Sequence, residues 1–158
     1  MKSNLVSKRE TAEVIKEISS QWKIELPKIK NLKFHYFDDN IIIISGGGLK
    51  AIKNGESYLP FLTETQILKK FPYVMVDMGA VKFMCKGANV MRPGITKYTS
   101  FEKDSVVCII EESQNKFLAV GKSCVISTEM ESMSKGEVVK NMHYISDKYW
   151  ESGKIIKD

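Results

Sequence analysis

The sequence predicts an α+β protein, in which an N-terminal unit of one helix and an antiparallel sheet precedes a small β barrel. Three observations lead to this class. One amphipathic helical pattern comes first, several short runs of β-branched and aromatic residues follow, and glycine-containing turns separate the later runs. A chain of 158 residues is long enough for two small domains. The predicted domains are residues 1–72 and 73–158, joined at Phe71-Pro72-Tyr73 without a flexible linker.

The first unit begins with a helix. Ser7 and Glu10 have the spacing of a capping box, in which the two side chains bond to the first backbone N–H groups. Apolar residues then recur at helical spacing, which predicts a helix over residues 8–20. These apolar residues are Val14, Ile15, Ile18 and Trp22.

A small antiparallel sheet is predicted next. Residues 33–37 and 41–44 form two strands around a turn at Asp38-Asp39-Asn40, and 49–53 follow as a third strand after Ser45-Gly46-Gly47-Gly48. Tyr58 to Leu62 form a bent extended segment. Thr63 is then a candidate cap for a helix through Lys70, which must end before Pro72.

The second unit is predicted to contain several short strands and two short helices. The predicted strands are 73–77, 89–92, 104–111, 116–121 and 137–145, and the predicted helices are 79–86 and 128–133. Many short strands linked by turns favour a barrel, because closing a sheet removes its exposed edges. Tyr149 and Trp150 are predicted to plug one end of that barrel.

The segment 76–95 is the most informative part of the chain. Gly79 precedes about two helical turns, Gly87 follows them, and a short apolar strand then ends at Arg92-Pro93-Gly94. Between Met78 and Phe101 there are four basic residues and no acidic one. The N–H groups at a helix start and nearby cations both favour phosphate, so this segment is a candidate binding site for a nucleic-acid backbone.

The spacing of this short helix predicts which side chains face outward. Val81, Met84 and Cys85 share one face and should pack on the barrel, whereas Lys82 and Lys86 share the other. Gly87 suits the left-handed residue that often ends a helix. The competing interpretation is that both glycines only shape turns and that the lysines are solvated surface.

Composition excludes several other classes. The net charge of +5 and a pI near 9.0 favour a polyanionic partner. Three cysteines without a CxxC pair argue against disulfides and structural zinc, and Cys108 and Cys124 are predicted to be buried. No metal and no cofactor is predicted. The polar start of the chain and the lack of long apolar runs predict a cytoplasmic protein without a membrane segment.

No catalytic residue is predicted. His35 and His143 stand among aromatic residues in predicted strands and are interpreted as structural, without a serine or cysteine partner. Gly121-Lys122-Ser123 lacks the first glycine of a phosphate-binding loop, since that position is Lys116. The glycines at 46–48 fit a hairpin turn better than a nucleotide loop.

Residues 73–150 resemble a PUA domain, an RNA-binding module named from pseudouridine synthases and archaeosine transglycosylases. Residues 41–72 are similar to the region that precedes this module in the malignant T-cell-amplified sequence family. The matching stretches are Val-Asp-x-Gly-Ala-Val-Lys-Phe at 76–83, Gly-Ala-Asn-Val-Met-x-Pro-Gly-Ile at 87–95, Leu-Ala-Val-Gly at 118–121 and His-Tyr-Ile-Ser-Asp-x-Tyr-Trp at 143–150.

This resemblance implies a pre-PUA domain followed by a β pseudo-barrel that grips structured RNA. The implied contacts lie in the first barrel helix, the loop before it and the next strand: Gly79, Ala80, Lys82, Phe83, Lys86, Gly87, Arg92, Pro93 and Gly94. It further implies a non-enzymatic protein that binds tRNA, at its 3′ end, or rRNA. Relatives act at the small ribosomal subunit in initiation and recycling with an initiation-factor-like partner.

Two alternatives remain open. The chain could position RNA as an accessory subunit of a tRNA- or rRNA-modifying enzyme. It could instead act as an adaptor whose N-terminal sheet docks an initiation-factor-like protein. Base recognition would require an exposed aromatic ring such as Phe83 or Tyr98, and for Phe83 a place in the barrel core is equally compatible with the sequence.

Overall fold

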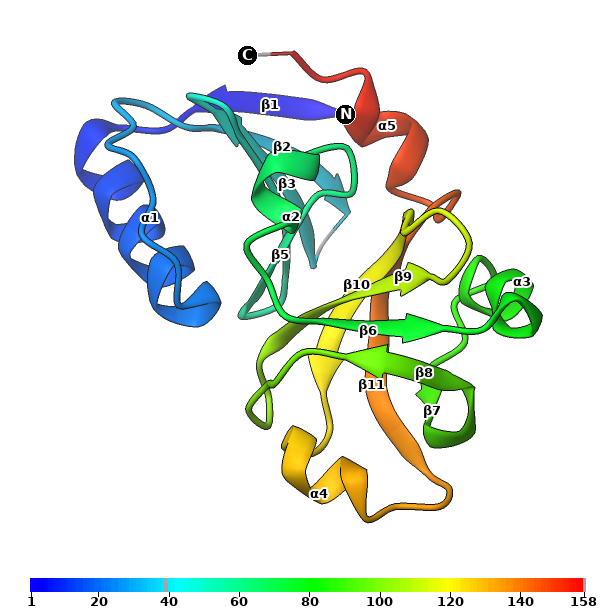
Figure 1. Ribbon diagram of the computed structural model, residues 1–158. Coiled ribbons are helices and arrows are strands. Elements are labelled where there is room, and N and C mark those ends of the chain that lie inside the picture. The colour runs from blue at the N-terminus through cyan, green and yellow to red at the C-terminus, as the bar shows by residue number, and fades with distance from the viewer. Residues whose placement is uncertain (39, 158) are drawn as a thin grey trace.

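The computed structural model describes residues 1–38 and 40–157, and Asp39 of the predicted turn lies outside the described residues. Two sheets form the molecule, a five-stranded antiparallel sheet in the order β1-β2-β3-β4-β5 and a six-stranded sheet in the order β7-β11-β10-β9-β6-β8. Figure 1 shows the first sheet beside α1 and the second curled into a nearly closed barrel. The predicted α+β class and its barrel are confirmed.

The N-terminal unit follows the predicted order. Helix α1 spans Lys8–Trp22, and the Ser7 hydroxyl accepts a hydrogen bond from the Glu10 N–H at 3.1 Å, which confirms the predicted cap. Thr11, Val14, Ile18 and Trp22 form its buried face. The strands are β2 (Lys33–Asp38), β3 (Ile41–Gly46), β4 (Leu49–Asn54) and β5 (Ser57–Pro60).

Two features of this unit differ from the prediction. Residues Lys2–Leu5 form an additional edge strand, β1, whose four side chains are all exposed, so no hydrophobic alternation marked it in the sequence. Helix α2 spans only Thr65–Leu68, and Thr63 does not cap it. The Thr63 hydroxyl instead donates to the Glu64 carboxylate at 2.7 Å.

The barrel contains six strands of mixed direction. They are β6 (Tyr73–Val76), β7 (Val90–Met91), β8 (Ile95–Tyr98), β9 (Val106–Glu111), β10 (Phe117–Ser123) and β11 (Glu137–Tyr144). Strand β6 runs parallel to β9 and antiparallel to β8, while the other pairs are antiparallel. Strand β8 was not predicted, because Arg92-Pro93-Gly94 was interpreted as the end of that segment. These three residues instead form a single 3₁₀ turn, η2 (Arg92–Gly94), which leads directly into β8.

Three short helices complete this half of the chain. The predicted helix 79–86 is a 3₁₀ turn, η1 (Met78–Ala80), followed by α3 (Val81–Met84), and α4 spans Ser127–Glu131. A further helix, α5 (Trp150–Lys154), was not predicted. No helix that the structure describes is long and apolar enough to cross a membrane.

Contacts between the two sheets are extensive. One hydrophobic cluster joins α1 and the first sheet to Val106, Cys108 and Val120 of the barrel. His143 is fully buried, accepts a hydrogen bond from the Leu62 N–H at 3.2 Å and lies 2.7 Å from Asp147 through its other ring nitrogen. Both histidines are thus bound within the fold, as predicted, since His35 lies between Ser3 and Ser45 in the first sheet.

The prediction for Tyr149 and Trp150 was wrong. Instead of plugging the barrel, Trp150 stacks on Phe61 of the first unit at 5.8 Å between ring centroids, and Tyr149 contacts Phe37 at 5.3 Å. Both rings join the apolar cluster formed by Ile41, Ile43 and Ile52 of the first sheet, where their surface is removed from water. The C-terminal helix therefore fastens the two units together (Figure 1).

Lys50 is the polar part of this attachment. Only 8% of the residue is exposed, and its Nζ donates to the Gly153 carbonyl at 2.9 Å and to the Ile156 carbonyl at 2.8 Å. Lys50→Met keeps the aliphatic stem but leaves two carbonyls without this donor, which should cost about 2–4 kcal/mol of unfolding free energy. Chemical denaturation measures this loss. Lys69→Met, at an exposed lysine, is the matched control, and an equal effect in both variants would contradict the assignment.

The cysteines are only partly as predicted. Cys108 is fully buried, and this burial raises the pKa of its thiol to about 12. Cys124 is half-buried, contrary to the prediction, because it follows the last residue of β10 and its thiol faces the Glu137 carboxylate at 3.6 Å. All three cysteines are free thiols.

Candidate nucleic-acid interface

The candidate interface starts where strand β6 ends. Asp77 caps the following turn, because its Oδ1 accepts a hydrogen bond from the Ala80 N–H at 3.0 Å. The Asp77 N–H donates in turn to the Gly94 carbonyl at 3.0 Å, and a Cβ on Gly94 would lie 3.8 Å from the Ala80 Cβ. The turn before α3 and the turn at residues 92–94 are therefore neighbours, although residues 81–91 lie between them in sequence.

Helix α3 presents the predicted faces. Met84 is buried, and Val81 and Cys85 pack against the barrel core. On the opposite side Lys82 is exposed, and so is Lys86, which lies in the turn after α3 because the helix ends at Met84 and not at the predicted residue 86. Phe83 is 51% exposed, which settles that it is a surface residue and not a core residue. The Lys82 Nζ lies 5.2 Å from the centre of the Phe83 ring, so a cation and an aromatic face are presented together.

The two lysines have no competing carboxylate close by. Among residues 1–38 and 40–157, no salt bridge within 4.0 Å involves Lys82 or Lys86. Two acidic side chains that border the turn before α3 are engaged with backbone: Asp77 accepts from the Ala80 N–H at 3.0 Å, and Glu112 accepts from the Met78 N–H at 3.2 Å. The positive charge is therefore available to an incoming phosphate.

The end of α3 is held by strand β11. Gly87 has φ of +90°, which confirms the predicted left-handed residue, and a Cβ there would meet the Tyr144 ring at 2.9 Å. The Asn141 side-chain amide donates to the carbonyls of Met84 and Ala88, each at 3.1 Å. Asn141 and Tyr144 thus position the loop, and neither role was predictable from sequence spacing because both residues lie more than 50 positions further along the chain.

The backbone conformation that requires glycine at position 87 is not found at Gly79. Its φ is not in the left-handed region, and a Cβ would contact only Asp77 Oδ1, at 3.3 Å. Turn geometry alone therefore does not require glycine at position 79. The residue is exposed, so the lack of a side chain leaves the backbone open to a close ligand approach.

Arg92 is turned away from the two lysines. Its Nε donates to the Met130 carbonyl at 2.9 Å, which places the half-buried side chain against α4 and not against α3. Only the other guanidinium nitrogens remain for a phosphate. Pro93 is exposed beside it, at the start of the 3₁₀ turn. The predicted residues are thus in two groups, one at η1, α3 and Gly94 and one at Arg92.

Tyr98 is less suited to base stacking than Phe83. It lies on strand β8, and its hydroxyl donates to the Glu131 carboxylate. This hydrogen bond raises the pKa of Tyr98 above its usual value. Because one end of the ring is held at α4, Phe83 is the aromatic residue on this face that is open to a base.

Two exposed methionines near the basic segment were not predicted from the sequence. Met78, in η1 before α3, is 48% exposed, and Met91, on β7 next to Arg92 in sequence, is 49% exposed. Large apolar side chains exposed near one another often mark a binding surface. The sequence feature that could have indicated their exposure is the run of basic residues around them, because helical periodicity alone assigns methionine to the core.

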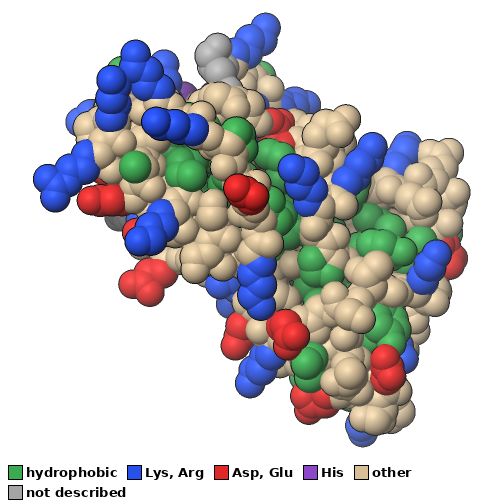
Figure 2. All heavy atoms as spheres, turned by 60° about the vertical axis from the view of Figure 1, so that its left-hand side comes forward, with side chains coloured by type: hydrophobic (Ala, Val, Ile, Leu, Met, Phe, Trp, Pro, Cys, Tyr) green, Lys and Arg blue, Asp and Glu red, His purple; other side chains and the backbone are tan. Residues whose placement is uncertain are grey.

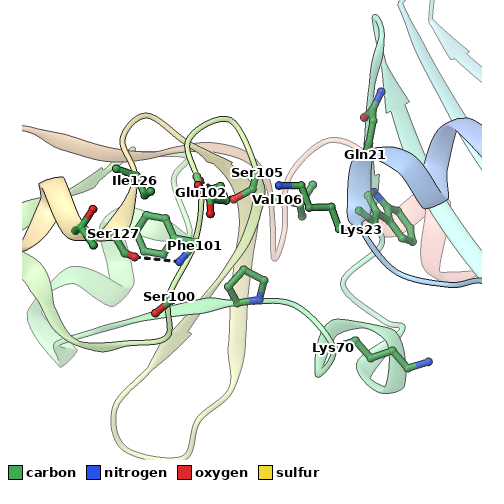
Figure 3. Close-up of a pocket in the computed structure, with 13 residues that line it drawn as sticks. Gln21, Lys23, Lys70, Ser100, Phe101, Glu102, Ser105, Val106, Ile126 and Ser127 are labelled. Atoms are coloured by element: carbon green, nitrogen blue, oxygen red, sulfur yellow. Dashed lines mark hydrogen bonds between the residues drawn. The ribbon is translucent and has the colours of Figure 1, made fainter.

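A separate pocket lies between the two units. It has a volume of about 340 Å³ and contains no residue of the predicted interface. Figure 3 shows Lys23 extending towards Ser105 and Val106 of the barrel, while Lys70 points away. The Phe101 N–H donates to Ser127 Oγ at 3.1 Å on its barrel side. Its two aromatic residues, Trp22 and Phe101, are each only 4% exposed, so neither ring is open to a base, and α3 remains the candidate interface.

Comparison with known proteins places this geometry in a family. A family model described as the PUA domain matches residues 72–145. An uncharacterised protein of Methanocaldococcus jannaschii is 32% identical over 156 residues, which cover 94% of this chain and 95% of the relative. The malignant T-cell-amplified sequence 1 homolog of Drosophila melanogaster is 30% identical over 148 residues, covering 89% and 81% of the two chains.

A solved structure supports the same assignment. A hypothetical protein from the hyperthermophilic archaeon Pyrococcus horikoshii superposes with a TM-score of 0.80 at 25% identity, covering 96% of this chain and 99% of that one. The PUA domain is an RNA-binding module, so the match implies that this chain binds RNA. The chain belongs to the PUA-domain family that includes the malignant T-cell-amplified sequence proteins.

Proposed function

We propose that this protein is a non-enzymatic RNA-binding factor that engages tRNA, at its 3′ end, or rRNA in translation initiation or ribosome recycling. The observation that carries the proposal is the exposed surface of α3 and of the turn after it, where Lys82 and Lys86 flank an exposed Phe83. Phosphates would lie against the lysines, and an unpaired base would stack on the ring. The curated relatives named for malignant T-cell amplification support this direction.

The proposed contacts divide by chemistry. Lys82, Lys86 and the outer nitrogens of Arg92 bind phosphate, whereas Gly79, Gly87, Pro93 and Gly94 provide a closely approachable backbone. Ala80 seats the turn on the barrel core. A protein partner or the small ribosomal subunit would add further contacts, because three cations give only modest, salt-sensitive affinity.

Trimming the tRNA tests the proposal that the protein binds its 3′ end. Full-length tRNA and tRNA lacking its terminal unpaired nucleotides are titrated with the protein in fluorescence anisotropy. We expect the trimmed tRNA to bind roughly tenfold more weakly, because each lost stacked base is worth about 1–3 kcal/mol. Equal affinity would exclude the 3′ end and leave a duplex region of tRNA or rRNA as the site.

Phe83→Ala tests the stacking surface independently. We expect roughly tenfold weaker binding to tRNA with an intact 3′ end and little change for trimmed tRNA. The thermal midpoint should stay near that of the parent protein, because half of the ring is already exposed. Tyr36→Ala, which removes another exposed aromatic side chain, on β2, is the control. Equal weakening in both variants would contradict a specific role for Phe83.

A further inference from the structure

A second basic surface lies along helix α1. Four lysines, Lys8 and Lys16 on α1 and Lys28 and Lys30 on the following loop, border a groove of about 630 Å³. Its floor is aliphatic and consists of Ala12, Ile15 and Ile29. Figure 2 turns the α1 side towards the viewer and shows Lys and Arg side chains around exposed apolar atoms. We call these seven residues the α1 groove.

The charges on α1 are segregated around its axis. At 100° per residue, Lys8, Ala12, Ile15 and Lys16 fall on one side, next to the buried face. The glutamates at positions 10, 13 and 17 fall on the opposite side, away from the groove. Among the residues that the structure describes, no salt bridge within 4.0 Å involves any of the four groove lysines. In this described part of the chain no carboxylate therefore neutralises the groove lysines at salt-bridge distance.

The walls of the groove are fixed before any ligand arrives. The Leu32 N–H donates to Thr11 Oγ1 at 3.0 Å, and the Asn31 side-chain amide donates to the Val6 carbonyl at 2.7 Å. Ile29 packs so closely on the turn between β3 and β4 that a Cβ on Gly47 would lie 2.9 Å from Ile29 Cγ1. A binding surface held in this way loses little entropy when it is occupied.

We propose that the α1 groove binds an acidic amphipathic segment of a partner protein. Carboxylates of that segment would pair with the lysines, and its apolar side chains would cover Ala12, Ile15 and Ile29. RNA fits less well, because unpaired bases need aromatic rings to stack on and the groove lining contains none. Helices α1 and α3 lie at opposite sides of the molecule in Figure 1, so RNA and the partner can bind together.

The full-length protein is tested with a fluorescein-labelled helical peptide that carries glutamate on one face and leucine on the other. A scrambled peptide of the same composition separates charge from amphipathic pattern. We expect Lys16→Glu with Lys28→Glu, and separately Ala12→Asp, to weaken peptide binding by at least about tenfold. Lys103→Glu with Lys135→Glu makes the same change of net charge at exposed positions outside the groove and should bind normally.

Each result decides the proposal. Loss of peptide binding in both groove variants, with normal binding by the control and weak binding of the scrambled peptide, supports it. Equal weakening in the control, or equal binding of both peptides, would show charge attraction without a site and overturn it. Displacement of the peptide from the parent protein by single-stranded polyuridylate, together with weaker direct binding of polyuridylate by the groove variants, would overturn it in favour of a second RNA contact. Thermal unfolding of Ala12→Asp confirms that the fold is retained.

Discussion

Replacing Lys82 and Lys86 with glutamate is expected to lower the affinity for tRNA by at least about tenfold at physiological salt. Lys82 on α3 and Lys86 in the turn after it are both exposed, and neither belongs to the core, so the substitution changes the field at the surface and leaves packing intact. Phosphates would then meet two carboxylates where they met two ammonium groups. The loss should shrink as salt is raised, because screening weakens attraction and repulsion alike.

The salt dependence makes this prediction specific. Each phosphate contact contributes about 0.7–0.9 to the slope of log affinity against log salt, so two lost contacts should reduce the slope by about 1.4–1.8. Anisotropy titrations over a series of salt concentrations measure it. Lys103→Glu with Lys135→Glu again serves as the charge-matched control. An unchanged slope in the α3 variant, or the same reduction in the control, would place the RNA elsewhere on the protein.

Much of the fold was predictable because its signals are local. The cap of α1 depends on Ser7 and Glu10, three residues apart, and the structure shows that bond. The division of α3 into a packed and an exposed face depends on residues within one turn of one another. Gly87 was also predictable, since only its own backbone conformation decides it. Each of these features is determined by near neighbours in sequence.

The remaining features depend on distant contacts. Asn141 bonds to the loop after α3 from more than 50 residues away, and no sequence spacing reveals that pairing. Helix α5 was missed because its apolar partners, Phe37 and Phe61, belong to the other half of the chain. Likewise, the direction of Arg92 is set by the Met130 carbonyl on α4. Tertiary contacts decide such residues, and local patterns do not.

Gly121→Ala is expected to destabilise the barrel by at least about 3 kcal/mol, because an added methyl group meets backbone and not a movable side chain. Gly121 lies on β10 where the register against β11 shifts. A Cβ at this position would lie 1.8 Å from the Lys140 carbonyl oxygen and 3.3 Å from the Asn141 Cα. To relieve the clash, β11 must move away. Asn141 would move with it and release the loop after α3, so tRNA binding should fall as well.

Thermal unfolding measures the first effect, with an expected fall in the midpoint of about 6–12 °C for a chain of this size. Gly94→Ala is the matched control, because a Cβ there makes only an ordinary contact of 3.8 Å with Ala80. It should unfold close to the parent protein, yet bind tRNA less tightly if the Gly94 backbone touches RNA. A normal midpoint for Gly121→Ala would mean that β10 and β11 can separate freely, and the role assigned to Asn141 in holding α3 would then fail.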